Sequence, residues 1–541
     1  MIVLHRITAW RAGRVLLGIG VGASLAACAV GPDYQRPSAP TVQDYTAAPL
    51  SQITAAAPGA GGNPQQFVRD MDIPGQWWTL FHSAPLNALI YDALKHNADA
   101  EAAQAALQVA WENVRAQRGA FYPSADVSVD PTRQNTGTVL SSGVASNSAL
   151  YSLTTAQVSV SYAPDLWGGN RRQVESLVAQ ANAQRFQLEA TYLTLTSNLV
   201  NAAIQEASLR AQIDATEHII DDQQRIMATL QRQLALGDAS EAAMAAQQAA
   251  LEQSRAMLPP LEKQLAQQRD LLAALSGRMP GDVIDAHFTL DALQLPGDLP
   301  LSLPARLVEQ RPDVRMADEQ LRAASAQVGV AIANRLPNVQ ISASVGSAAV
   351  QASSLLTTGT GFWSIGAGIT APLFDGGTLK HKQRAAEATY RQSAAQYRST
   401  VIDAVQNVAN VLHAVQSDAA ALASAELAER AVSRSLAIAQ QQLALGDISE
   451  VVMLNAEQTW RQAAITLAQA RANRYADTAA LFQALGGGWW NRQDVVPSQA
   501  VPTHLLNCLP KHRVVETARV ARGLREPLAV ARQRQARGLS V

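Results

Sequence analysis

Residues 170–236, NRRQVESLVAQANAQRFQLEATYLTLTSNLVNAAIQEASLRAQIDATEHIIDDQQRIMATLQRQLAL, decide the fold of this 541-residue chain. Stepping by four and three residues from Val174 to Leu234, fourteen of eighteen positions are apolar. The polar exceptions are Arg185, Glu206, Thr216 and Gln223. A sustained period of 3.5 residues is typical of helices that coil around one another. Because neither Gly nor Pro interrupts these 67 residues, they predict one helix of about 100 Å.

The sequence contains an internal duplication. Residues 378–445 form a second stretch of 68 residues without Gly or Pro. Five landmarks recur in the same order at offsets of 208–214 residues: HNAD at 96–99 and QRPD at 310–313, Tyr122-Pro123 and Leu336-Pro337, Ala163-Pro164 and Ala371-Pro372, LALGD at 234–238 and 443–447, and LSG at 275–277 and LGG at 485–487. This order predicts a duplicated half-protein rather than a short solenoid unit.

Each half also contains two shorter helical stretches. They are predicted over 85–119 and 239–276 in the first half, and over 304–335 and 449–485 in the second. Each pair, placed end to end, roughly equals one long helix. Proline lacks an N–H donor, so Pro259-Pro260 predicts a break within 239–276.

Between the helices the period changes from 3.5 to 2. Apolar residues alternate with Ser, Gln, Thr or Gly over 157–162, 339–346 and 363–370, and more weakly around Val127 and Val129. Such strands have one apolar face, which would meet a second sheet in a soluble sandwich and lipid in an outer-membrane barrel. Four strands cannot close a membrane barrel. We therefore expect an oligomer, with eight strands in a dimer or twelve, enough for a channel, in a trimer.

The N-terminus has the pattern of a lipoprotein signal peptide. Three arginines precede an apolar run at 15–23, and Leu25-Ala26-Ala27-Cys28 follow it. The run is shorter than the roughly 20 residues of a membrane-spanning helix. The small residues ending in Cys resemble a bacterial lipobox, which predicts removal of 1–27 and lipid on Cys28. The alternative is a plain signal peptide with an incidental Cys28.

Composition and motifs argue against nucleic-acid binding and catalysis. The net charge is -1 and only 16% of residues are charged, which disfavours binding to a polyanion. Neither an HExxH nor a Walker pattern is present, and two cysteines exclude a four-cysteine zinc site. We expect no enzyme, no catalytic residue, no metal and no cofactor beyond covalent lipid on Cys28. His218 and Asp222 are interpreted as an exposed helix face.

The chain resembles the lipid-anchored, NodT/OprM-type branch of the TolC-like outer membrane factors, which serve resistance-nodulation-division efflux pumps. The matching runs are VGPDYQRP at 30–37, WWTLF at 77–81, LPPL at 258–261, RPDV at 311–314, APLFDGG at 371–377, LGDIS at 445–449 and LGGGW at 485–489. The resemblance covers residues 28–490. It implies a mainly α fold with membrane β-structure: a homotrimer with a twelve-stranded barrel in the outer-membrane lipid and a coiled-coil periplasmic tunnel. It also implies a periplasmic adaptor and an inner-membrane pump as partners.

The expected organisation follows from the repeat and the resemblance. It consists of a signal peptide (1–27), a lipid-anchored extended segment (28–84), a first repeat (85–277), a linker (278–303), a second repeat (304–490) and a basic, disordered extension (491–541).

The helix turns hold the candidate functional residues. Acidic residues often line the closed periplasmic end in this family, although Val452 and Asn455 stand at two such places here. The candidate gate residues are Asp238, Glu241, Asp447 and Glu450. The candidates for adaptor docking are Leu236, Gly237, Leu445, Gly446 and Ser449. Threefold symmetry would turn each acid into a ring that favours cations; the alternative is that these acids only cap or solvate helix starts.

The predicted function is a passive outer-membrane channel component of a tripartite efflux pump. It would export drugs or other small toxic compounds and open at its periplasmic turns when the adaptor and pump dock. A type I secretion conduit of the same fold is one alternative. A lipid-anchored periplasmic adaptor is another, but that class needs a lipoyl-like β domain and lacks membrane strands. The lipobox and the Gly31-Pro32-Asp33-Tyr34 run favour efflux.

Overall fold

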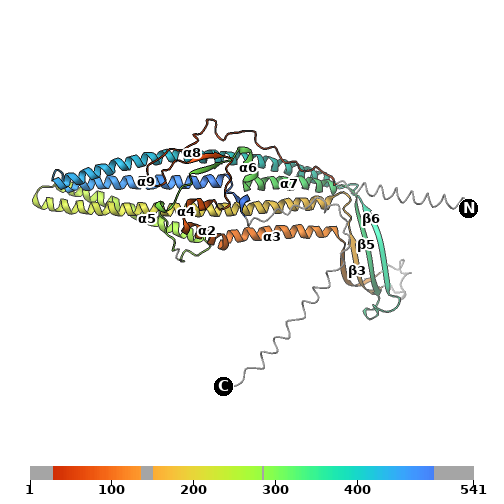
Figure 1. The fold of residues 1–541 in the computed structure, drawn as a ribbon. Coiled ribbons are helices and arrows are strands. Elements are labelled where there is room, and N and C mark those ends of the chain that lie inside the picture. Colours follow the sequence, from red (N-terminus) through yellow and green to blue (C-terminus); the bar gives the residue numbers. More distant parts are fainter. Residues whose placement is uncertain (1–28, 136–149, 283–284, 493–541) are drawn as a thin grey trace, which may run out of the picture. The chain divides into compact units, whose positions relative to one another are not determined.

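The computed structural model describes residues 29–135, 150–282 and 285–492 (Figure 1). The signal peptide, Cys28 and nearly all of the C-terminal extension therefore lie outside the described residues. The helices of the first half are α2 (Ala84–His96), α3 (Ala98–Arg118), α4 (Gly169–Leu236) and α5 (Glu241–Leu275). Those of the second half are α6 (Pro304–Gln310), α7 (Pro312–Ala333), α8 (Thr378–Leu445) and α9 (Glu450–Ala484).

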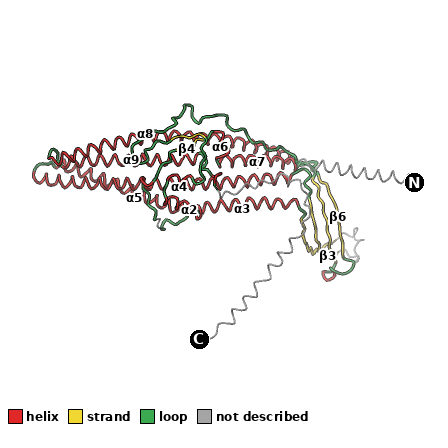
Figure 2. Tube along the Cα trace, viewed as in Figure 1, coloured by secondary structure: helices red, strands yellow, loops and turns green. Residues whose placement is uncertain are grey.

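The two long helices, α4 and α8, have 68 residues each, which confirms the predicted coiled-coil rods. Glycine in the left-handed conformation stands at both ends of each helix: Gly168 and Gly237 flank α4, and Gly377 and Gly446 flank α8. Glycine adopts positive φ without a steric cost. Figure 2 shows the long helices running beside the shorter ones along their length. The heptad periodicity predicts these two helices, and the glycines that flank it predict where they begin and end.

The shorter helices differ from the prediction at three places. The stretch 85–119 divides at Asn97, whose Oδ1 accepts a hydrogen bond from the Ala100 amide at 3.1 Å and caps α3. The stretch 304–335 divides at Arg311, which is extended at ψ 125° because the residue before a proline avoids the helical region.

The predicted break at Pro259-Pro260 is wrong, because α5 continues through both prolines. Gln247 donates to the Gln223 carbonyl at 3.3 Å before the pair, and Gln268 donates to the Ala202 carbonyl at 3.1 Å after it. Both acceptors lie on α4, so tertiary contacts hold α5 on each side of the missing N–H donors. Packing here outweighs the local cost of proline.

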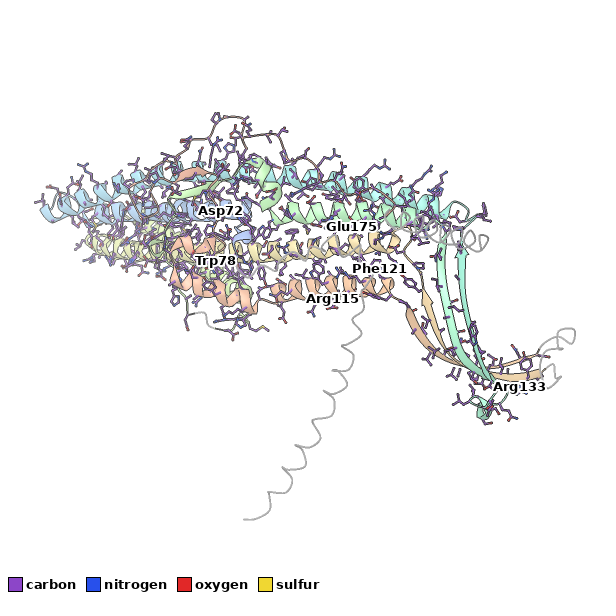
Figure 3. All side chains as sticks on the ribbon, turned by 45° about the vertical axis from the view of Figure 1, so that its right-hand side comes forward. Asp72, Trp78, Arg115, Phe121, Arg133 and Glu175 are labelled. Atoms are coloured by element: carbon purple, nitrogen blue, oxygen red, sulfur yellow. The ribbon has the colours of Figure 1, made fainter. Side chains whose placement is uncertain are left out.

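The four predicted strands are confirmed. They are β2 (Ser124–Asn135), β3 (Leu150–Tyr162), β5 (Asn338–Ala349) and β6 (Gly361–Thr370). They form one antiparallel sheet in the order β2-β3-β5-β6, so β2 and β6 are its edges. In Figure 3, Phe121 lies near the start of β2 and Arg133 lies toward the opposite end of the sheet.

Apolar side chains of the sheet are exposed in the single chain. Val127 is 77%, Trp363 74% and Ile369 74% accessible. Within the described ranges, no helix combines the length and the apolarity that a membrane-spanning helix needs.

An aromatic core joins the N-terminal segment to the end of the second repeat. The short helix Trp77–Phe81 places Trp77 flat against Phe482 of α9, with ring centroids 5.5 Å apart and an interplanar angle of 14°. Trp78 and Phe81 contact Trp77 edge-on. Nearby, β1 (Gln66–Arg69) pairs in parallel with β4 (Asp298–Leu301) of the inter-repeat linker. The N-terminal segment is therefore an integral part of the helical core.

Candidate functional site

The α4–α5 and α8–α9 turns have the same closed geometry. Gly237 and Gly446 adopt φ of 82° and 78°. The amide of Asp238 donates to the Gln233 carbonyl at 2.8 Å, and the amide of Asp447 donates to the Gln442 carbonyl at 2.9 Å. These are glycine-terminated helix ends of the Schellman type. Both glycines therefore shape the turns for which adaptor docking is predicted from the sequence.

Two apolar side chains project from these turns. Leu236 and Leu445 are 77% and 78% exposed, although leucine is usually buried. The turns are thus rigid at the backbone and apolar at one position each.

The candidate gate acids lie at one end of the bundle, where the two turns are neighbours (Figure 1). Asp238, Glu241 and Asp447 are exposed. Glu450 is also exposed, but its Oε2 accepts a hydrogen bond from the Thr229 hydroxyl of α4 at 3.0 Å. The structure therefore separates Glu450, which ties α9 to α4, from three acids that face solvent in the single chain.

The two turns differ in their helix caps, which allows a matched test. Ser240 Oγ accepts from the Ala243 amide at 3.1 Å, whereas Ser449 makes no side-chain cap. We expect Ser240→Ala to destabilise the first turn of α5 by about 1 kcal/mol, and Ser449→Ala to leave α9 unchanged. Amide hydrogen exchange at residues 241–245 and 450–454 measures both. If residues 241–245 were as well protected in Ser240→Ala as in the wild type, the assignment of the cap would be contradicted.

A buried polar cluster between α4 and α9 was missed. Asp222 is only 3% exposed, so its interpretation as part of an exposed face is wrong; His218, with half of its side chain accessible, does face solvent. On α9, Glu457 and Arg461 form an ion pair at 3.2 Å. Burial, with the charge of Glu457, raises the pKa of Asp222 to about 6. The signal was the neighbouring Gln223, a polar residue in the apolar heptad pattern, which donates to Gln458 Oε1 at 3.4 Å.

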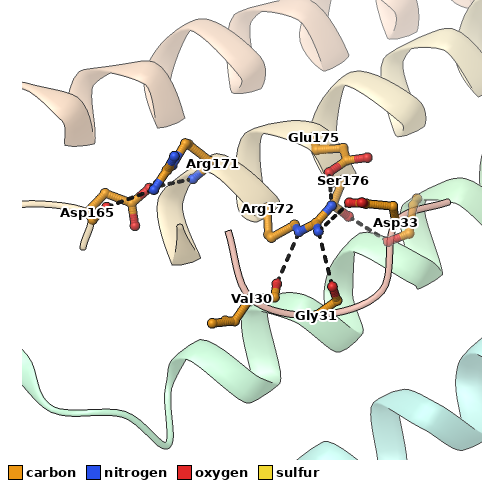
Figure 4. A network of polar contacts seen from close by, with 9 residues as sticks. Val30, Gly31, Asp33, Asp165, Arg171, Arg172, Glu175 and Ser176 are labelled. Atoms are coloured by element: carbon orange, nitrogen blue, oxygen red, sulfur yellow. Dashed lines mark hydrogen bonds and ion pairs between the residues drawn. The ribbon is translucent and has the colours of Figure 1, made fainter. Parts of the chain in front are cut away.

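The opposite end of α4 holds the first described residues of the chain (Figure 4). The Val30 amide donates to the Trp167 carbonyl at 3.0 Å. Arg172, whose side chain is 6% exposed, donates to the carbonyls of Val30 and Gly31 at 3.2 and 3.3 Å. It also forms an ion pair with Asp33 at 2.7 Å. The segment after Cys28 is thereby held where the chain passes from β3 into α4.

A second set of contacts continues this attachment along α7. The Tyr34 hydroxyl donates to the Asp318 carboxylate, and Arg36 forms an ion pair with the same carboxylate at 3.3 Å. Within the described residues, no group of three or more His, Cys, Asp or Glu side chains is placed to hold a metal ion.

The described residues combine duplicated coiled-coil helices, a four-stranded sheet with two open edges, and two closed helix turns. Residues 89–278 and 303–487 match the outer membrane efflux protein family. Because the match spans more than half of the sequence, the chain belongs to this family. The TolC-like fold and the outer-membrane location predicted from the sequence are confirmed.

Individual relatives agree with this assignment. The chain is 27% identical over 418 residues to the pyoverdine export outer membrane protein OpmQ of Pseudomonas aeruginosa, covering 76% of this chain and 87% of the relative. It is 27% identical over 480 residues to the cation efflux system protein CusC of Escherichia coli, covering 88% and 98%.

Solved structures share the fold. The outer-membrane channel OprN superposes with a TM-score of 0.74 at 25% identity, covering 85% of this chain and 100% of that one. The CmeC outer membrane channel of Campylobacter jejuni gives a TM-score of 0.76 at 22% identity, covering 86% and 97%. The family and these neighbours are channels rather than enzymes. This chain is accordingly an outer-membrane channel component of an efflux system.

Proposed function

We propose that this chain acts as a homotrimer, forming the passive conduit through which a tripartite pump exports drugs or other small toxic compounds. The observation that carries the proposal is the pair of open edges, β2 and β6, on a sheet with exposed apolar side chains. Unpaired strand edges are not tolerated in lipid. Since β2 and β6 run in opposite directions, pairing β6 with β2 of the next copy continues the antiparallel order. Three copies would close twelve strands around a channel.

We further propose that Cys28 carries lipid. Ala29, the next residue, lies against Gly168 at the start of α4, a short distance along the chain from the end of β3. Acyl chains on Cys28 would therefore enter the membrane leaflet beside the barrel. Each buried CH2 contributes about 0.8 kcal/mol, so several chains would supplement the barrel's own insertion.

The helix turns at the other end are the proposed docking surface for a periplasmic adaptor and an inner-membrane pump. The exposed Leu236 and Leu445 offer apolar contacts on a rigid backbone. Asp238, Glu241 and Asp447 would form rings around the threefold axis, and Glu450 would hold α9 against α4 in the closed state. An adaptor opens such a turn by binding the open state more tightly than the closed one. The chain itself performs no catalytic step.

A deletion strain tests the efflux function. We expect deletion to increase susceptibility to several unrelated toxic compounds, because the pump then has no exit through the outer membrane. The wild-type gene should restore resistance, and Cys28→Ser should restore it only in part. Unchanged susceptibility to every compound, with loss of a secreted protein from the medium instead, would favour a type I secretion conduit.

The pore itself is tested with purified protein. A trimer that needs detergent and conducts ions in planar bilayers is the expected result. A water-soluble monomer without conductance would identify a periplasmic adaptor instead.

A further inference from the structure

The duplicated sequence relates the arrangement of corners and junctions inside the chain to their arrangement on the neighbouring copy. The β3–α4 corner (residues 163–169) and the β6–α8 corner (residues 371–377) are equivalent at an offset of 208 residues. The helix-to-strand junctions Tyr122-Pro123 and Leu336-Pro337 are equivalent at an offset of 214. Each corner is thus expected to use an equivalent junction.

Inside the chain, the first corner packs on the second junction. The Trp167 indole N–H donates to the Pro337 carbonyl at 2.7 Å. The strands β3 and β5, which adjoin this contact, are hydrogen-bonded neighbours. Leu336 and Pro337 are correspondingly half-buried.

Within the part of the chain that the structure describes, the second corner has no such cover. Leu373 is 100% exposed and Phe374 is 93% exposed. The first junction is uncovered too, since Tyr122 is 61% exposed and Pro123 is exposed. Each corner has an aspartate that accepts from a backbone amide at the start of its helix, Asp165 from Asn170 at 3.0 Å and Asp375 from Gly377 at 2.8 Å. The two aspartates are not equivalent: at the offset of 208, Asp375 stands where the first corner has Trp167, and Leu373 and Phe374 stand where it has Asp165 and Leu166.

The helices repeat this asymmetry. Ser176 of α4 donates to the Ala323 carbonyl of α7 at 3.2 Å, and Ala323 is 6% exposed. The residue of α3 equivalent to Ala323 is Val109, which is 61% exposed. Among the described residues, no helix covers Val109, so this part of α3 lacks the cover that Ala323 of α7 has.

We infer that Leu373 and Phe374 of one copy pack on Tyr122 and Pro123 of the next copy, closing the ring where the barrel meets the helices. The contact rests on the proposed trimer and identifies the residues that lock it. The same relation between neighbouring copies places α8 of one copy against α3 of the next, and β6 of one copy against β2 of the next. Burial of these two large apolar side chains, which are exposed in the single chain, favours association of the copies.

Disulfide trapping tests this contact. In a Cys508→Ser background, Tyr122→Cys combined with Phe374→Cys should give covalent dimers and trimers on oxidation, which a reducing agent reverts to monomers. Linkage within one chain is excluded by geometry: three strand spacings, about 14 Å, separate the two edges, whereas disulfides need Cα atoms within about 7 Å. Tyr122→Cys with Leu356→Cys is the matched control, because the equally exposed Leu356 (94%) lies in the β5–β6 loop at the far end of the sheet.

The possible outcomes distinguish a failure of the proposed contact from a failure of the proposed trimer. Covalent trimers for the 122/374 pair and none for the 122/356 pair support the inference. A trimer of normal size and conductance that forms no 122/374 disulfide overturns the contact and leaves the proposed function intact. A protein that neither trimerises nor conducts overturns the proposed function itself.

A second measurement covers variants that assemble poorly. Phe374→Ser and Tyr122→Ser should each lower the temperature at which the wild-type trimer dissociates, and together should lower it by less than the sum. Additive shifts, as for residues that contact only lipid or solvent, would overturn the contact.

Discussion

Trp77→Ala is expected to lower the free energy of unfolding by about 3–5 kcal/mol, the usual cost of truncating a buried tryptophan. Trp77 is 1% exposed, stacks on Phe482 and contacts Trp78 and Phe81 edge-on. Its removal would leave a cavity between the N-terminal segment and α9, which are far apart in sequence. Denaturant unfolding of the detergent-solubilised protein, followed by tryptophan fluorescence, measures the loss.

Trp363→Ala is the matched control for this experiment. Trp363 is 74% exposed on β6, so its truncation creates no cavity and should cost less than about 1 kcal/mol. Equal losses in the two variants would show that the aromatic core does not stabilise the described fold.

The second large effect is a dependence of stability on pH that comes from a carboxyl pair between α8 and α9. Burial, together with a hydrogen bond and repulsion from Asp418, raises the pKa of Asp477 to about 7. Arg474, one turn away on α9, is itself buried and donates to Thr54 Oγ1 at 3.2 Å and the Asn63 carbonyl at 2.8 Å. The Arg474 guanidinium therefore binds the N-terminal segment, and it also lies near Asp418 of the carboxyl pair.

The direction of this pH dependence follows from proton binding in the folded and unfolded states. An unfolded aspartate has a pKa of about 3.9, so the folded state holds this proton more tightly between about pH 4 and 7. Stability should therefore rise as the pH falls from 8 to 5, and be lost as the pH rises through 7. Asp477→Asn keeps a neutral side chain at every pH and should remove most of this slope, stabilising the protein at pH 8 by on the order of 2 kcal/mol.

Melting temperatures at pH 5, 6, 7 and 8 test the carboxyl pair. Asp238→Asn, at the exposed α4–α5 turn, serves as the control and should follow the wild type. A profile for Asp477→Asn that parallels the wild type would show that the pair does not share a proton. Asp222, between α4 and α9, shifts in the same direction, so Asp222→Asn should flatten the slope that remains between about pH 4 and 6.

Features written in nearby residues could be predicted. The long helices α4 and α8 follow from heptad spacing between terminal glycines, and the strands follow from alternation with small polar residues. The turns were located for the same reason, because Gly237 and Gly446 mark them in the sequence.

Features that depend on distant residues were missed or mistaken. The prolines of α5 are tolerated because Gln247 and Gln268 bind α4 on either side of them. The burial of Asp222 depends on the approach of α9, and the attachment of residues 30–36 depends on Arg172 and Asp318. Local periodicity settles which segments become helix or strand, since backbone hydrogen bonds and side-chain spacing act over a few residues. Which polar side chains are buried, and which segments cross them, depends on packing between segments that lie from 24 to 284 residues apart in these cases. The local pattern of one segment carries no record of its partner.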